Sequence, residues 1–330
     1  MRANNVKSDL LGFCIPTYNR MAYLSKCIDS ILREVATYDI PIYISDNASE
    51  DGTESYIMEL SHTYENIIYK RNLSNLGQYT NILNVIRMAR SDYIWILGDD
   101  DTIKTGSVTK VIESLVKGVD YLVVNSSIYD RNLLNLLRKQ TINCRRDSEY
   151  LPNQCGDLFS TLSKRTFNGF MSSMIIKTSL IQSLIPKYCE EGFVLKGNSW
   201  LLTAMFYEAI WKKSGKFVCR PQVNARKNPR VTDKDPLSFM YLDRIKAVEY
   251  LESIGYSKKN LKKSYRRSLL AIVFHSVLTK YIKYPSCIFD DFIKSDKRIP
   301  FAAKLVVMFV DILPRFVIKI ANGIIRVIVK

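Results

Sequence analysis

The chain has 330 residues and 47% of them are hydrophobic, which excludes a disordered protein and suffices for one large domain or two modest ones. A formal net charge of +16 and a pI of about 9.4 indicate an anionic partner: nucleic acid, a phosphorylated substrate or an acidic membrane surface. The seven cysteines are scattered without a C-x-x-C pair, which argues against a disulfide framework or a zinc site and fits a reducing cytoplasm.

The first 125 residues alternate strand-like and helix-like segments. Apolar runs predict buried strands at residues 10–16, 40–46, 66–72, 91–98 and 120–125. Apolar residues at helical spacing predict helices between them, at residues 21–35, 50–64, 77–90 and 105–117. This alternation predicts an α/β fold, with a mostly parallel sheet covered by helices on both faces.

The remainder of the chain is less regular and more basic. Residues 126–235 look rich in loops and include a basic stretch at 211–230, and the pattern is helical from residue 236 onward. No long apolar segment precedes the first strand, so we expect no cleaved signal peptide, and no window reaches the roughly 18 apolar residues of a membrane-spanning helix.

Residues 299–330 form a separate pattern in which a polar residue recurs about once per helical turn on an otherwise apolar segment. Pro314 is expected to kink or break this helix. A narrow cationic stripe on a broad apolar surface favours a helix that lies in the membrane interface. The alternative is a helix packed on the protein with its polar stripe facing water.

Polar residues follow each of the first three predicted strands, where ligands of parallel sheets bind. Pro16 ends the first strand, and Thr17, Tyr18 and Arg20 follow it. These residues either contact a base and phosphate or cap the next helix. The second strand ends in Asp46 and Asn47, which suit a nucleobase or ribose, or else an Asx-turn. Asn75 and Gly77 follow the third strand, where the glycine either permits close approach of a ligand or only makes a turn.

Three consecutive carboxylates, Asp99, Asp100 and Asp101, follow the fourth strand. Their mutual repulsion suggests that a cation binds there. Since the chain has only two histidines, a metal would be held mainly by oxygen ligands, which favours Mg²⁺ or Mn²⁺. The alternative is an exposed acidic turn that caps the helix starting near Thr105.

Four segments in this order and spacing resemble family 2 glycosyltransferases with the GT-A fold: FCIPTYNRMAYLSKCIDSIL, IYISDNASEDGTE, RNLSNLGQYTNIL and YIWILGDDD. The form of the last segment and the basic, apolar C-terminus resemble bacterial O-antigen enzymes, including the abequosyltransferase group. The resemblance implies that the strand ends bind a nucleoside-diphosphate sugar. Asp46 would then hold the base or ribose and Asp99 would lie near the ribose. Asp100 would bind Mn²⁺ or Mg²⁺ through the diphosphate with Asp101 in support, as in the family's D-x-D-type motif.

The resemblance also implies an inverting transfer, which needs a carboxylate base for the acceptor hydroxyl. Glu190 and Glu191 are the best candidates, with Asp157 behind them, although the family's frequent Glu-Asp signature is not cleanly present. The alternative places both glutamates in a solvated turn. Arg226, together with Asn228 and Arg230, would close over the diphosphate or else belong to a generally basic surface.

The sequence thus predicts a peripheral enzyme on the cytoplasmic face of the cell membrane that adds a hexosyl or deoxyhexosyl group to a lipid-diphosphate-linked oligosaccharide. Residues 1–125 would bind the nucleotide sugar, 126–235 the acceptor, and 236–330 the anionic membrane surface. A sugar-phosphate nucleotidyltransferase is the second possibility, but a glycine-rich phosphate loop is missing after the first strand. A nucleic-acid-binding protein is the third, although the basic residues coincide with amphipathic segments, so no nucleic acid is expected as a partner.

Overall fold

The computed structural model describes residues 9–35, 39–163, 169–227 and 236–281, together with Ile299 and Lys304. Its internal contacts divide the chain into two units. The first unit contains residues 1–197 and 201–229, and the second contains Asn198–Trp200 and the chain from Arg230 onward.

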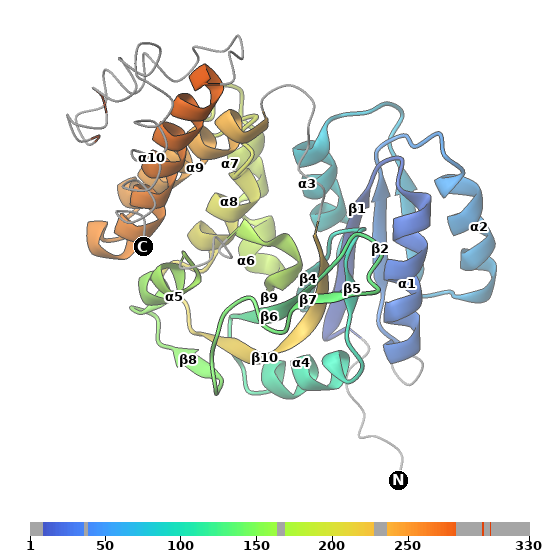
Figure 1. The fold of residues 1–330 in the computed structure, drawn as a ribbon. Coiled ribbons are helices and arrows are strands. Elements are labelled where there is room, and N and C mark those ends of the chain that lie inside the picture. The colour runs from blue at the N-terminus through green and yellow to red at the C-terminus, as the bar shows by residue number, and fades with distance from the viewer. Residues whose placement is uncertain are drawn as a thin grey trace. The chain divides into compact units, whose positions relative to one another are not determined.

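The described strands join into one sheet (Figure 1). They are β1 (Leu11–Thr17), β2 (Ile42–Asp46), β3 (Ile67–Arg71), β4 (Tyr93–Ile96), β5 (Thr102–Ile103), β6 (Tyr121–Tyr129), β7 (Leu136–Arg138), β8 (Ser148–Tyr150), β9 (Met174–Lys177) and β10 (Gly215–Arg226). The helices of the first unit are α1 (Met21–Val35), α2 (Thr53–Thr63), α3 (Gln78–Met88), α4 (Ser107–Leu115), α5 (Cys155–Leu162), the short 3₁₀ helix η3 (Met171–Ser173), α6 (Thr178–Gln182), α7 (Ile185–Cys189) and α8 (Leu201–Ala209).

The first four strands form the parallel part of the sheet in the order β3-β2-β1-β4. The chain moves outward from β1 to β3 and then returns to the other side of β1, so the winding reverses between β1 and β4. Right-handed crossovers place α1 and α2 on one face and α3 on the opposite face, as Figure 1 shows. The predicted α/β fold with a mostly parallel sheet covered on both faces is therefore confirmed.

The second part of the sheet is mixed, and of its strands only the start of β6 was predicted from the sequence, at residues 120–125. Strand β9 lies between β4 and β6 and is antiparallel to both, whereas β10 is parallel to β6. The segment expected to be rich in loops therefore contributes β7, β8, β9 and β10. Part of the basic stretch at 211–230 is β10, a strand with a register shift between Val218 and Val223.

The core of the first unit explains why these segments form these elements. The strands β1, β2 and β4 are buried almost throughout, which matches their continuous apolar sequences. Helix α1 buries Leu24, Ile28 and Ile31, which recur every three to four residues. These side chains pack in one cluster with Phe13 and Trp95, whose rings stack with centroids 5.3 Å apart.

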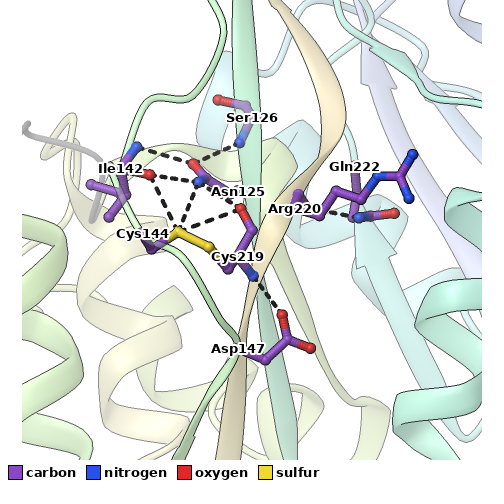
Figure 2. Close-up of a disulfide and its surroundings, with 8 residues drawn as sticks. All are labelled: Asn125, Ser126, Ile142, Cys144, Asp147, Cys219, Arg220 and Gln222. Atoms are coloured by element: carbon purple, nitrogen blue, oxygen red, sulfur yellow. Dashed lines mark hydrogen bonds between the residues drawn. A yellow bond between two sulfur atoms is a disulfide. The ribbon is translucent and has the colours of Figure 1, made fainter.

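A disulfide joins Cys144 to Cys219, with Cα atoms 5.8 Å apart, and corrects the expectation that the cysteines form no such bond (Figure 2). The two residues are 75 positions apart in sequence, so only the pairing of distant segments brings them together. Asn125 fixes the same region, since its amide donates to the carbonyls of Ile142 at 2.7 Å and Cys219 at 2.9 Å. The loop after β7 is thus attached to β10 by covalent and hydrogen bonds.

The second unit contains helices α9 (Pro236–Ser253) and α10 (Lys258–Tyr281). Arg244 is fully buried in it, donates to the Ser264 hydroxyl at 2.9 Å and lies over the Trp200 ring at 4.9 Å. Burial lowers the pKa of Arg244 to about 10. Asp243 accepts the backbone N–H of Ser199 at 2.7 Å.

The predicted amphipathic helix at 299–330 lies outside the described residues, except for Ile299 and Lys304. Across the part of the chain that the structure describes, no helix combines the length and the apolar character needed to cross a bilayer.

Candidate active site

A pocket of about 440 Å³ opens at the carboxyl ends of the parallel strands, and we call it the strand-end pocket. It lies where the winding reverses between β1 and β4, the position at which open α/β sheets bind their ligands. Its lining residues come from the segments that follow all four parallel strands, from the start of α3 and from η3. They are Pro16, Thr17, Tyr18, Arg20, Asn47, Asn75, Gly77, Gln78, Asn81, Gly98, Asp99, Asp100 and Met171.

Side chains from the end of β1 hold the aspartates after β4. The Thr17 hydroxyl donates to Oδ2 of Asp99 at 2.8 Å. Arg20 Nη1 lies 3.2 Å from Asp99 Oδ1 and 3.3 Å from Asp100 Oδ2. The Arg20 side chain is 46% exposed, so this guanidinium contacts two carboxylates while keeping surface free for an anionic ligand.

Asp101 does not line the pocket and connects residues 98–101, which we call the aspartate loop, to two distant elements. Its Oδ2 accepts the Ser172 hydroxyl at 2.6 Å, and its Oδ1 accepts the backbone N–H of Arg226 at 2.9 Å. The Ser172 hydroxyl also accepts the N–H of Gly98 at 2.9 Å. A methyl group on Gly98 would come within 3.2 Å of Asp100 Oδ1, so the turn before the aspartates has little room for a side chain.

Burial has the largest effect on the pKa values of Asp99 and Asp101. It raises the pKa of Asp99 to about 6, although the Arg20 charge opposes this change. Burial, and then the charge of Asp100, raise the pKa of Asp101 to about 7, although the Ser172 hydroxyl and the Arg226 N–H oppose this change. Three adjacent carboxylates in a poorly solvated loop therefore favour the arrival of positive charge.

A network of asparagine amides shapes the other side of the strand-end pocket. Asn47 donates to Asn75 Oδ1 at 2.6 Å and accepts the N–H of Leu76 at 2.9 Å. Asn81 is buried and donates to the carbonyls of Thr17 at 3.2 Å and Ser45 at 2.9 Å. The amides thus tie the ends of β1, β2 and β3 to the start of α3.

Gly77 begins α3 with φ of +83°, and a Cβ there would meet no atom within 4 Å. Its backbone conformation, rather than lack of space, therefore favours glycine at this position. The sequence offered two interpretations of Gly77, close approach of a ligand or a turn. The positive φ gives a reason for glycine in the turn.

Asp46 is fully buried beside the strand-end pocket and does not line it. Its Oδ1 accepts the hydroxyl of Ser49 at 2.5 Å and the N–H of the same residue at 3.0 Å, as in the Asx-turn interpretation. Its Oδ2 accepts the Tyr69 hydroxyl at 2.8 Å. The adjacent Asn47 is the residue of this pair that faces the cavity, and a nucleotide contact by Asp46 remains a prediction.

The residues proposed as the catalytic base do not line the strand-end pocket. Glu190 and Glu191 lie in an exposed turn after α7, where the Glu191 side chain is 99% exposed and 3.3 Å from Lys196. Asp157 is exposed in the first turn of α5. The geometry agrees with the alternative of a solvated turn for both glutamates.

Arg226 is buried at the end of β10 and contacts backbone rather than open space. Its Nε donates to the carbonyl of Asp100 at 2.8 Å, Nη1 donates to the carbonyl of Arg131, and the guanidinium lies 4.6 Å from the centre of the Tyr23 ring. Among the described residues, its buried Nη2 has no hydrogen-bond partner. These contacts make Arg226 a support of the aspartate loop. Asn228 and Arg230 lie outside the described residues.

The sequence analysis missed three polar residues that organise the site: Ser172, Asn81 and Asn72. Ser172 is 71 residues from Asp101, and no local pattern indicated this contact. Asn72 donates to Asn47 Oδ1 at 3.1 Å and to Asn81 Oδ1 at 3.0 Å. Asn72 is the last residue of the predicted strand 66–72 and Asn81 lies near the start of the predicted helix 77–90, and this position at the strand ends was the available signal.

Comparison with known proteins agrees with this geometry. The family model described as glycosyl transferase family 2 matches residues 13–182, which is just over half of the chain and includes β2, β3, β4 and most of β1. The chain belongs to glycosyl transferase family 2. The resemblance inferred from the four sequence segments is thereby confirmed.

Two curated bacterial relatives are sugar transferases according to their names. The chain is 37% identical to the abequosyltransferase RfbV of Salmonella typhimurium over 175 residues, which cover 51% of this chain and 53% of the relative. It is 29% identical over 119 residues to a Campylobacter jejuni enzyme named GalNAc(5)-diNAcBac-PP-undecaprenol beta-1,3-glucosyltransferase, covering 36% of this chain and 38% of that protein. The matches thus span about half of the first relative and less of the second.

Solved structures confirm the GT-A fold over most of the chain. S. aureus TarS 1-349, solved in complex with UDP-GlcNAc, superimposes with a TM-score of 0.62 at 13% identity and covers 92% of this chain and 88% of its own. The mannosyltransferase PcManGT from Pyrobaculum calidifontis, solved with GDP-Man and Mn²⁺, gives a TM-score of 0.51 at 11% identity and covers 92% and 87%.

Proposed function

We propose that the chain transfers one sugar from a nucleoside-diphosphate sugar to a lipid-linked saccharide in the synthesis of O-antigen or a related surface polysaccharide. The observation that carries the proposal is the strand-end pocket, where Arg20, Asp99 and Asp100 meet at the point of winding reversal. The name of the Salmonella relative supports sugar transfer, and the name of the Campylobacter relative, which includes a saccharide linked through PP to undecaprenol, supports the class of the acceptor.

The residues of the strand-end pocket fit a divalent metal bound together with the donor diphosphate. Within the described part of the chain, no three His, Cys, Asp or Glu side chains are grouped as a complete metal site. Mg²⁺ and related ions, however, commonly take only one or two carboxylates and complete their coordination with substrate phosphates and water. Asp100 and Asp99 would supply those carboxylates, and Asp101 would keep the loop in position. When bound, the metal would stabilise charge on the departing nucleoside diphosphate.

Other parts of the chain have proposed roles in the same reaction. Arg20 would contact the diphosphate through its exposed surface, and Asn47 with the β3–α3 turn would contact the nucleoside. The transfer would be inverting, and Glu190, Glu191 and Asp157 remain predictions for the base. Residues 1–125 would form the nucleotide-sugar half and 126–235 the acceptor half. Residues 236–330 would associate with the cytoplasmic face of the membrane.

The test is a donor panel of UDP-, GDP-, CDP- and dTDP-sugars, each with Mn²⁺ or with EDTA, in which release of nucleoside diphosphate and thermal shift are measured. Asp100→Asn removes a charged ligand at nearly constant volume, and Asp29→Asn makes the same change on the exposed side of α1. We expect a metal-dependent response to one nucleotide class that is lost in Asp100→Asn and kept in Asp29→Asn. Equal responses from both variants and the unchanged protein would refute the role of the aspartate loop.

A further inference from the structure

A second cavity, of about 870 Å³, lies between the start of α4, the loop after β7 and the middle of β10, and we call it the basic cavity. Six cationic side chains line it: Lys104, Lys110, Lys139, Arg145, Arg146 and Arg220. It shares no lining residue with the strand-end pocket, so the two are separate sites.

The positive charge of the basic cavity is poorly neutralised. Its two carboxylates are Glu113, which lies 4.0 Å from Lys110, and Asp147, which already pairs with Lys216 outside the lining at 2.9 Å. Among the described residues, Lys110 alone of the six cations lies within 4.0 Å of a carboxylate. Five cationic side chains are therefore available to an anionic ligand.

The cations also act on one another. Burial, and then the positive charge of Arg220, lower the pKa of Lys104. Like charges held in one concave surface repel, and an anion that contacts several of them removes that repulsion.

The scaffold fixes the walls of the basic cavity. The Cys144–Cys219 disulfide precedes Arg145 on one wall and Arg220 on the other, as Figure 2 shows for Arg220. Gln222 is buried, and its carbonyl accepts the N–H of Lys104 at 2.8 Å and the Ser107 hydroxyl at 2.8 Å. These contacts keep the arginines and Lys104 around one space rather than spread over an open surface.

We infer that the basic cavity is a binding site for a multiply charged phosphate group, such as a phosphate monoester or a diphosphate. Arginine is suited to this ligand because its planar fork pairs with two phosphate oxygens at once. The volume accommodates a diphosphate with an attached organic group. The phosphate group would come either from a phosphorylated molecule in solution or from the headgroup of a membrane lipid. The inference does not depend on the proposed sugar transfer.

The first measurement is titration calorimetry of the full chain with sodium pyrophosphate in EDTA. Arg145→Ala/Arg146→Ala removes two cations from the basic cavity, and Lys70→Ala/Lys117→Ala removes two exposed lysines that do not line it. Arg20→Ala reports any pyrophosphate bound in the strand-end pocket. We expect the arginine pair to weaken binding about tenfold or more, both alone and combined with Arg20→Ala, with the lysine pair close to the unchanged protein. Arg145→Lys/Arg146→Lys, which keeps the charge, should recover part of the affinity.

The second measurement separates the two sources of the phosphate group. Sedimentation is followed with vesicles of phosphatidylcholine alone or mixed with phosphatidic acid, whose headgroup is a phosphate monoester. A lipid headgroup is indicated if the arginine pair loses binding to the anionic vesicles and pyrophosphate displaces the unchanged protein. A soluble ligand is indicated if only pyrophosphate binding changes. If the arginine pair retains its melting temperature and its affinity for both probes, or loses no more affinity than the lysine pair, the inference is overturned.

Discussion

Ser172 connects two parts of the aspartate loop, and its replacement by alanine removes both contacts at once. In the folded chain its hydroxyl donates to the buried Asp101 carboxylate at 2.6 Å and accepts the N–H of Gly98 at 2.9 Å. Loss of a hydrogen bond to a charged group costs about 1.5–3 kcal/mol, and a buried N–H left without a partner adds about 1–3 kcal/mol. Because the two costs are not additive, we expect the free energy of unfolding to fall by about 3 kcal/mol.

The neighbouring Ser173 provides a matched control. It is equally buried in the same 3₁₀ helix, but its hydroxyl donates to a neutral acceptor, the Phe170 carbonyl, at 2.6 Å. Ser173→Ala is therefore expected to cost about 1 kcal/mol, the typical net value of a neutral hydrogen bond. Both variants remove the same atom from the same element, so their difference reports the contacts of Ser172 with Asp101 and with the Gly98 N–H.

The assay is urea denaturation at pH 8, where Asp101 is ionised, followed by tryptophan fluorescence. Of the three tryptophans, the buried Trp95 lies beside this site, since its indole donates to the Ser172 carbonyl at 2.9 Å. Ser172→Ala should also weaken donor binding, because the loop that carries Asp99 and Asp100 loses its support. Equal costs for the two serines, within about 0.5 kcal/mol, would refute the assignment of Asp101 as a buried anion held by Ser172.

Three further predictions concern the aspartates, the disulfide and the β3–α3 turn. Asp99 and Asp101 keep protons in the folded chain up to about pH 6 and 7, whereas unfolded aspartates lose them near pH 4. The melting temperature of the ligand-free protein should therefore fall as the pH rises from 5 to 8, and it should fall less in Asp101→Asn. A melting temperature that rises over this range contradicts the pKa assignments. Cys144→Ser opens a loop of 75 residues and should lower the free energy of unfolding by up to about 4 kcal/mol in the chain-entropy model. Urea denaturation with and without reductant measures this difference. Equal stability of the wild type and the variant under oxidising conditions contradicts the disulfide. Gly77→Ala places a side chain at φ of +83° and should lower the free energy of unfolding by about 1–2 kcal/mol. It should also weaken nucleotide binding, which calorimetry measures. No change in either quantity would show that this turn accommodates a side chain without strain.

The sequence alone determined the parallel half of the fold because its signals are local. A buried strand needs only a short apolar run, and a covering helix needs only apolar residues every three to four positions. Since all parallel strands end at one edge, the order of the strands along the chain was enough to assign Thr17, Arg20, Asn47, Asp99 and Asp100 to one pocket.

Only the tertiary structure decided how the second half completes the sheet and which polar groups face the ligand. The antiparallel insertion of β9, the pairing of Cys144 with Cys219 and the contact of Ser172 with Asp101 join residues far apart in sequence, so no periodicity encodes them. The same reason explains why Asp46 is buried against Tyr69 and why Glu190 and Glu191 lie in solvent: residue type specifies the chemistry that a side chain offers, whereas the packing of distant segments specifies what that side chain meets.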